Sequence, residues 1–147
     1  MRWSPHITVA TVLEKDGRLL FVEELIDGQH VLNQPAGHWE NGETLIEASI
    51  RETREETAWV YEPHYLVGIY QWRHPQKQHT FLRFCFGGEL LEHHSEQALD
   101  KEIVRTIWLD RDELLARQAV HRSPLVLTCV EDYLAGQRYE LSLLKHF

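Results

Sequence analysis

The stretch GHWENGETLIEASIRETREETAW, residues 37–59, decides both the fold and the chemistry of this chain. It contains six glutamates and only two arginines, which are Glu40, Glu43, Glu47, Glu52, Glu55, Glu56, Arg51 and Arg54. Thr44 is followed three residues later by Glu47, a capping box that predicts the start of a helix. Like charges crowded on one helix repel one another, so this segment calls for a positive partner.

The helical period separates these glutamates into two groups. At about 100° per residue, Glu43 shares one face with Arg54, as expected of a solvated surface. Glu52 and Glu56 lie at the border of the buried arc, with Glu55 one step further round. An unpaired carboxylate in a buried position costs on the order of several kcal/mol. A solvated acidic face is the alternative on composition alone, but the buried border favours a bound cation.

The loop before this helix, residues 33–37, has the sequence Asn-Gln-Pro-Ala-Gly and can bring a backbone carbonyl against the same helix edge. Several carboxylates and one carbonyl oxygen form an all-oxygen site, which suits Mg²⁺, with Mn²⁺ as the alternative. We therefore predict a divalent metal site here, and the metal charge would offset the repulsion among the glutamates.

Gly37, Glu43 and residues 51–56 resemble the signature of the Nudix hydrolases, G-x5-E-x7-R-E-U-x-E-E-x-G-U, in which U is a bulky aliphatic residue. Two positions depart from it. Thr53 stands where an aliphatic residue is usual, and we expect only weaker packing there. Ala58 replaces the closing glycine, and a left-handed helix cap costs a non-glycine residue roughly 1 kcal/mol.

The resemblance implies the roles of several side chains. The implied metal ligands are the carboxylates of Glu52, Glu55 and Glu56 and the carbonyl of Gly37. Arg51 would orient a carboxylate by bidentate pairing, and Glu43 would have a supporting role. The general base stays open between Glu56, Glu55 and a residue outside the signature. Our outside candidate is Glu102, which precedes a predicted strand; its alternative is an exposed loop glutamate.

Four residues are candidates for substrate contacts, which are His38, Trp39, Trp72 and Arg83. The two tryptophans, together with Phe81, can stack on a ring or can build the core. Arg83 lies in the middle of a predicted strand, where it would bind a phosphate or point to solvent. His38 follows the loop and would contact substrate or make a structural hydrogen bond.

The resemblance extends over residues 6–139 to a branch of small bacterial members of the family. That branch implies hydrolysis of nucleoside tri- and diphosphates, thiamine pyrophosphate and hydroxymethylpyrimidine pyrophosphate, with release of orthophosphate. A pyrophosphatase of ADP-ribose or of another nucleotide-linked diphosphate is the alternative. A non-catalytic ligand sensor with the same fold is a third possibility, although a sensor would not need to keep the carboxylates of Glu43, Glu52, Glu55 and Glu56.

The remaining sequence predicts an α/β (α+β) fold, a Nudix-type α/β/α sandwich with a mixed β-sheet between helices. Residues 6–13 and 18–24 read as a hairpin across a turn at residues 15–17. Further strands are expected at residues 30–34, 65–72, 80–90 and 103–109. Helices are expected after Asp110, which forms a second capping box with Glu113, and after Ser123, with Gly136 at the far end.

Length and composition bound the function. The 147 residues, 43% hydrophobic, predict one domain spanning residues 1–147 and a monomer, because one core needs no partner. The formal charge of -8 argues against a nucleic-acid binder but not against a small phosphorylated substrate. No apolar run approaches the roughly 20 residues that cross a membrane. Cys85 and Cys129 read as free thiols in a reducing compartment, so we expect a cytoplasmic protein without a secretion signal.

Overall fold

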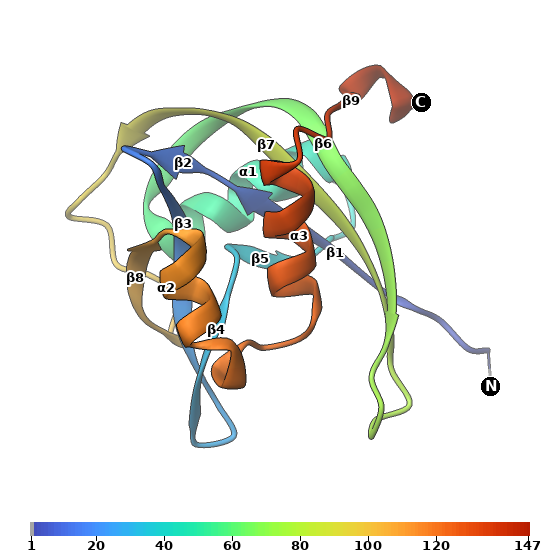
Figure 1. Ribbon diagram of the computed structural model, residues 1–147. Coiled ribbons are helices and arrows are strands. Elements are labelled where there is room, and N and C mark those ends of the chain that lie inside the picture. The colour runs from blue at the N-terminus through green and yellow to red at the C-terminus, as the bar shows by residue number, and fades with distance from the viewer. Residues whose placement is uncertain (1) are drawn as a thin grey trace.

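The computed structural model describes residues 2–147, which form two β-sheets and three α-helices (Figure 1). The strands are β1 (His6–Val12), β2 (Glu14–Lys15), β3 (Arg18–Ile26), β4 (Gln29–Asn33), β5 (Ala36–His38), β6 (Trp59–Arg73), β7 (Thr80–His93), β8 (Ile103–Leu109) and β9 (Tyr139–Glu140). The helices are α1 (Leu45–Thr57), α2 (Arg111–Ala116) and α3 (Leu125–Leu134), with short 3-10 turns at Gln118–Val120 and Leu141–Leu143.

One sheet is mixed and the other is antiparallel. The first has the strand order β5-β1-β7-β6-β9, in which β1 and β7 run parallel and the other pairs run antiparallel. In the second sheet β3 lies between β4 and β8, and β2 pairs with the beginning of β3. The expected strands are therefore present, but they are divided between two sheets.

The predicted hairpin between residues 6–13 and 18–24 is wrong in most of its length. Only Glu14 and Lys15 pair with β3, opposite Leu19 and Arg18. Both edges of β1 are occupied by other strands, because β5 pairs with one edge and β7 with the other. The chain therefore leaves the first sheet at Leu13 and turns back only after it has entered the second.

The sheets lie between helices, and strand alternation divides the core into two clusters. In β1, Val9 packs with Ala48 of α1, whereas Ala10 packs with Cys129 and Val130 of α3. The α1 side also includes Leu13, Leu20, Tyr61, Leu66 and Phe86. The α3 side also includes Val12, Leu19, Phe21, Val67, Cys85, Leu109 and Leu114. The α/β/α sandwich is confirmed.

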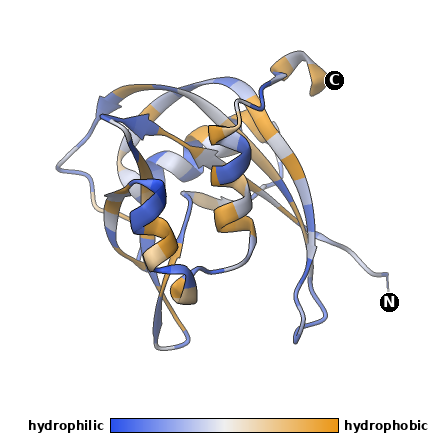
Figure 2. Ribbon diagram, in the orientation of Figure 1, coloured by the Kyte–Doolittle hydropathy of each residue, from blue (hydrophilic) through white to orange (hydrophobic). Residues whose placement is uncertain are grey.

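The two covering helices differ in character. Hydrophobic residues run along α3, whereas α1 is mostly hydrophilic (Figure 2). The core contacts of α1 come from a narrow face that includes Leu45, Ala48 and the partly buried Ile46. Because so little of α1 is apolar, most of its carboxylates stay outside the core or at its border.

The helix starts follow the expected caps. In α1 the Glu47 N–H donates to Thr44 Oγ1 at 3.0 Å, and the Thr44 N–H donates to Glu47 Oε1 at 2.8 Å. Asp110 and Glu113 form the same reciprocal box at α2. In α3 the cap position is Pro124, one residue later than expected, although the Ser123 hydroxyl still accepts from Leu125 N–H at 3.1 Å.

The end of α1 carries the strain expected from the missing glycine. Ala58 has φ 63° and ψ 13°, the left-handed conformation, and its N–H donates to the Arg54 carbonyl at 2.8 Å. A residue with a Cβ pays roughly 1 kcal/mol for this conformation. The helix nevertheless ends where the signature requires, so the departure costs stability without displacing the glutamates.

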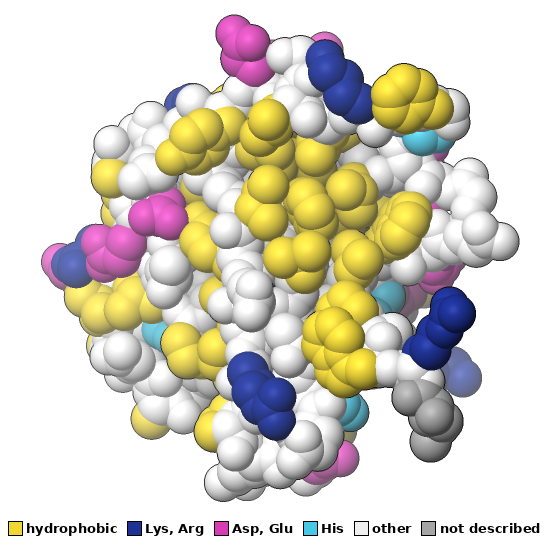
Figure 3. Space-filling model, turned by 90° about the vertical axis from the view of Figure 1, so that its right-hand side faces the viewer, with side chains coloured by type: hydrophobic (Ala, Val, Ile, Leu, Met, Phe, Trp, Pro, Cys, Tyr) yellow, Lys and Arg dark blue, Asp and Glu magenta, His cyan; other side chains and the backbone are white. Residues whose placement is uncertain are grey.

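Exposed apolar side chains gather over β6 and the C-terminal segment, on the face shown in Figure 3. Ile69, Leu134, Tyr139 and Leu143 are among them. Ile69, Tyr139 and Leu143 line a shallow pocket together with Leu66 and Tyr70. None of the helices in residues 2–147 has the length and hydropathy needed to cross a membrane.

Candidate active site

The carboxylates of α1 divide as the helical period predicts. Glu47 and Arg54 are exposed, whereas Glu56 is 7% exposed and Glu52 is partly buried. Thr53 is fully buried between them, and Ala48 anchors the preceding turn in the core. The buried face of α1 therefore fixes the direction in which Glu52 and Glu56 project.

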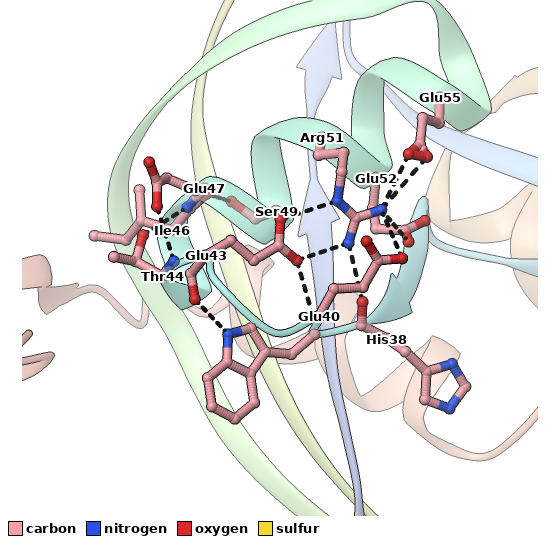
Figure 4. Close-up of polar contacts among 11 residues, drawn as sticks. His38, Glu40, Glu43, Thr44, Ile46, Glu47, Ser49, Arg51, Glu52 and Glu55 are labelled. Carbon is pink, nitrogen blue, oxygen red and sulfur yellow. Dashed lines mark hydrogen bonds and ion pairs between the residues drawn. The ribbon is translucent and has the colours of Figure 1, made fainter.

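The guanidinium of Arg51 is the centre of a carboxylate cluster (Figure 4). Its Nε and Nη2 donate to the two oxygens of Glu43 at 3.0 and 2.8 Å, the expected bidentate pair. Its Nη1 donates to Glu52 at 2.8 Å and to Glu55 at 3.0 Å, and Nη2 also donates to the His38 carbonyl at 3.0 Å. These bonds lower the pKa of Glu43, raise that of Arg51, and tie α1 to the end of β5.

Glu56 is held from the loop side. The Ala36 N–H donates to Glu56 Oε1 at 2.9 Å. Burial raises the pKa of Glu56 to about 9, although the hydrogen bond from Ala36 acts in the opposite direction. Burial also raises the pKa of Glu52 to about 7. Both carboxyl groups thus carry their negative charge at a cost that a nearby cation would remove.

Gly37 lies directly against the Glu52 carboxyl group, as expected of the loop before the helix. A Cβ built at Gly37 would overlap both oxygens and the Cδ of Glu52. Gly37 pairs with Val9 of β1, so the loop backbone is held in place from its other side. The close approach leaves room for the Glu52 carboxylate only because residue 37 has no side chain.

Asp100 is a member of the cluster that the sequence analysis missed. Glu52, Glu55 and Asp100 each offer a carboxylate oxygen, and these atoms lie within 4.8 Å of one another. Asp100 N–H donates to the Glu55 carbonyl at 3.1 Å, which fixes this segment to the last turn of α1. The side chain of Glu102, the outside candidate, is exposed and is not part of the three-carboxylate group.

The predicted aromatic contacts lie in two places. Trp39 is 45% exposed, and its indole N–H donates to the Glu43 carbonyl at 2.7 Å. Trp72 stacks on Phe81 with ring centroids 5.7 Å apart. A row of rings continues from Phe81 through His6 to His38, whose Nε2 is 3.3 Å from His6 Nδ1. This aromatic row, formed by His38, His6, His79, Phe81 and Trp72, reaches the edge of the carboxylate cluster.

Arg83 points into the protein, on the side of the sheet that α3 covers. It shares this face with Cys85 and is 5% exposed. Its Nη1 donates to Gln34 Oε1 at 2.8 Å and its Nη2 donates to Asn33 Oδ1 at 3.0 Å. The expected solvent-facing alternative is wrong, and the contacts make Arg83 a support for the loop that carries Ala36 and Gly37.

The donor set fits a divalent metal ion. The carboxylates of Glu52, Glu55 and Asp100 converge, and Glu56 lies on the same helix edge. Burial, with a smaller effect of the neighbouring carboxylates, raises the pKa of both Glu52 and Glu56, so a cation bound there would stabilise their charged forms. Oxygen ligands of this kind are those that Mg²⁺ and Mn²⁺ prefer.

Thr53, the first departure from the signature, is explained by a partner on β1. The hydroxyls of Thr11 and Thr53 are 3.0 Å apart, and both residues are fully buried. We predict that Thr53→Val, which restores the aliphatic type, lowers the free energy of unfolding by about 1–2 kcal/mol, because the Thr11 hydroxyl loses its partner. Urea denaturation measures this, and Thr11→Val/Thr53→Val should recover most of the loss. Equal losses in the single and double variants would contradict the pairing.

The raised pKa values predict an unusual pH dependence of stability. The ordinary pKa of a glutamate side chain is 4.5, whereas in the folded protein the pKa is about 7 for Glu52 and about 9 for Glu56. The folded protein therefore binds more protons than the unfolded chain between these values, and the stability present below pH 4.5 is lost as the pH rises toward 9.

We therefore expect the metal-free protein, in EDTA, to show a lower free energy of unfolding at pH 8.5 than at pH 5.5, by chemical denaturation. Glu56→Gln should flatten this trend because its amide does not titrate. Mg²⁺ should raise the stability of the natural protein most at the higher pH. A stability that rises over this range would contradict the assignment.

Comparison with known proteins places the chain among related sequences and structures. A NUDIX domain family model matches residues 4–128. Phosphatase NudJ of Escherichia coli (strain K12) is 41% identical over 145 residues, 99% of this chain and 94% of that protein. A NUDIX hydrolase from Nitrosomonas europaea has a TM-score of 0.95 at 46% identity, with 98% of each chain covered.

More distant structures share the fold alone. The NUDIX domain of Shewanella oneidensis NrtR, complexed with ADP ribose, has a TM-score of 0.70 at 15% identity, with 90% of each chain covered. The similarity to the first two proteins, in contrast, extends over nearly the whole chain and includes the segment that carries the carboxylate cluster.

Proposed function

The chain belongs to the Nudix family of hydrolases, which act on phosphoanhydride bonds, and we propose that it is a Mg²⁺-dependent phosphohydrolase of nucleoside tri- and diphosphates. We include thiamine pyrophosphate and hydroxymethylpyrimidine pyrophosphate among its substrates and orthophosphate as its product. The similarity to phosphatase NudJ over 99% of the chain supports this choice within the family.

The observation that carries the proposal is the convergence of Glu52, Glu55 and Asp100 around the clamp made by Arg51. With Glu56 and the carbonyl of Gly37, these carboxylates would hold Mg²⁺, or Mn²⁺ in its place. A bound divalent ion supplies charge neutralisation at the phosphate oxygens, which is the main requirement of phosphoryl transfer.

The protein groups supply position and proton transfer. Arg51 keeps Glu43 charged and fixes Glu52 and Glu55, so that these carboxylates need little reorganisation when substrate arrives. Glu56 is the base we favour over Glu55 and Glu102. Its Oε1 is fixed by the Ala36 N–H, whereas no hydrogen bond within residues 2–147 occupies Oε2.

The ring of the substrate would lie along the aromatic row. His38 links this row to the carboxylate cluster, because its carbonyl accepts from Arg51 and its ring contacts His6. Burial lowers the pKa of His38, with help from the charges of His6 and Arg122, which favours a neutral ring that can stack. Either a purine or a pyrimidine can stack on such a row, because stacking does not depend on the identity of the ring. This suits a broad substrate range.

The test is a panel of GTP, GDP, thiamine pyrophosphate and ADP-ribose, incubated with Mg²⁺, with orthophosphate and pyrophosphate measured separately. Orthophosphate from the first three substrates supports the proposal. Pyrophosphate from GTP, or turnover of ADP-ribose alone, would replace the substrate assignment and keep the metal site. No turnover of any substrate would favour a ligand sensor and would contradict the proposed function.

We also propose that the protein acts in the cytoplasm as a monomer with one domain. The two core clusters share the strands of the same sheets, which supports a single folding unit. Light scattering after gel filtration tests the monomer. A dimer that dissociates when Ile69 and Leu143, in the exposed apolar surface over β6, are changed to Ser would contradict it.

A further inference from the structure

Glu24 and Arg122 form an ion pair that the proposed reaction does not use. Arg122 Nη1 donates to Glu24 Oε2 at 3.0 Å. Glu24 is 5% exposed, and its Oε1 is buried without a hydrogen-bond partner in the part of the chain that the structure describes. The side chain of Arg122 is 42% exposed. The pair thus connects a buried carboxylate to a cation that reaches the surface.

The side chain of Glu24 lies on the side of β3 that faces helix α1. Side chains alternate along a strand, so Glu24 shares its side with Val22 and with Leu20, which packs in the cluster under α1. The negative charge of Glu24 is also one cause of the raised pKa of Glu56. Glu24 is therefore a neighbour of the carboxylate cluster, although it comes from the second sheet.

Arg122 is fixed at the rim of the same site. Its N–H donates to the Leu32 carbonyl at 2.8 Å, and the preceding His121 forms a bridge with Leu32. Leu32 leads into the loop whose Ala36 N–H holds Glu56. The positive charge of Arg122 also lowers the pKa of His38 on the edge of the cluster. Arg122 therefore contacts Glu24 and lies close enough to His38, at the edge of the carboxylate cluster, for its charge to act there.

Arg51 and Arg122 differ in how many of their guanidinium donors are already bonded to the protein. In Arg51, Nε, Nη1 and Nη2 all donate to protein oxygens. Arg122 makes one side-chain hydrogen bond to the described residues, through Nη1, so its Nε and Nη2 donors are available. A guanidinium fork matches two oxygens of a phosphate group, and a di- or triphosphate carries more charge than one divalent cation neutralises.

We propose that Arg122 binds a phosphate group of the substrate and that Glu24 positions its guanidinium for this contact. The inference rests on the proposed function, because its ligand is the polyphosphate of that reaction. The buried Glu24 carboxylate holds Nη1, which would leave the Nε and Nη2 donors of Arg122 to pair with phosphate oxygens of the substrate.

The first experiment separates binding from turnover with two matched variants. Arg122→Gln removes the proposed contact, and Arg105→Gln removes an arginine that pairs with Glu23 on the other face of β3. With GTP and Mg²⁺, Arg122→Gln should raise KM about tenfold or more, the loss of roughly one charge-assisted contact, and should leave kcat within about twofold. Arg105→Gln should leave both unchanged. An unchanged KM in Arg122→Gln would overturn the proposal.

A structural role of the pair predicts a different pattern. Arg122→Gln alone leaves Glu24 buried without its partner, which can destabilise the protein. The double variant Glu24→Gln/Arg122→Gln removes both charges and should recover the stability. If the pair only stabilises the fold, the double variant should regain the natural KM. If Arg122 binds phosphate, the KM of the double variant should stay raised although its thermal midpoint is restored.

Calorimetric binding of inorganic pyrophosphate with Mg²⁺ tests the contact without turnover. In a Glu56→Gln background, Arg122→Gln should weaken the affinity about tenfold or more, whereas Arg105→Gln should not. If the natural protein hydrolyses none of the panel substrates, the proposed function fails and this measurement still decides the role of Arg122. If turnover is present but pyrophosphate binds the Arg122→Gln protein equally well, the role of Arg122 falls and the proposed function stands.

Discussion

Glu56→Gln is expected to lower kcat for GTP by on the order of 10³-fold, because it removes the carboxylate to which we assign both metal binding and proton transfer. Glu56 is buried, and its Oε1 already accepts a hydrogen bond from the Ala36 N–H at 2.9 Å. The amide oxygen of glutamine can accept the same bond in the same shape. The variant should therefore keep the fold and lose the charge, and steady-state kinetics at saturating Mg²⁺ measures the effect.

The matched control is Glu47→Gln on the same helix. Glu47 is exposed and closes the capping box with Thr44, a role that glutamine also fills. Both variants remove one negative charge from α1, so they differ only in the position of that charge. Glu47→Gln should retain activity within about twofold. Comparable losses in both variants, or loss of the fold in Glu56→Gln, would refute a specific role for the Glu56 carboxylate.

The sequence predicts the part of the site that depends on local structure. The capping box of Thr44 and Glu47 spans three residues, and the helical period then places Glu52 and Glu56 on one edge whatever the rest of the chain does. The pair of Arg51 with Glu55 is an i,i+4 contact of the same kind. These interactions lie within one helix, so their spacing can be read directly.

The missed partners depend on contacts between segments that are distant in the sequence. Thr11 meets Thr53 only because β1 passes under α1, and Asp100 reaches Glu55 only because the chain returns to α1 before β8. Arg122 meets Glu24 across a sequence separation of 98 residues. Local periodicity carries no information on these registers.

The wrong hairpin has the same cause. Residues 6–13 and 18–24 each have the strand pattern and a turn between them, which satisfies every local rule for a hairpin. The edge of β1 that would accept β3 is instead taken by a strand from elsewhere, since β5 and β7 occupy its two edges. The inward direction of the Arg83 side chain is also set by this arrangement. The register of β7 beside β1 places Arg83 on the face of the sheet where it donates to Asn33 and Gln34.

Gly37→Ala is expected to lower kcat/KM on the order of 100-fold, the scale at which misplaced metal ligands reduce activity. The new Cβ would overlap the Glu52 carboxyl group, which would have to move. Gly37 does not have a left-handed φ, so alanine can adopt the backbone conformation found there. Because the group that moves is the end of a flexible side chain, the fold should survive while the site is displaced.

A double-mutant cycle decides whether Gly37 acts through Glu52. Glu52→Ala removes the carboxylate that the Gly37→Ala methyl would displace, so the two single variants should lose similar activity. The double variant Gly37→Ala/Glu52→Ala should then be no worse than Glu52→Ala, because the second change has nothing left to move. Isothermal titration with Mn²⁺ should show the same non-additive loss of metal affinity, with thermal midpoints close to that of the natural protein. Additive losses would instead mean that Gly37 contributes independently of Glu52, for example through its own carbonyl oxygen, and would contradict the steric explanation.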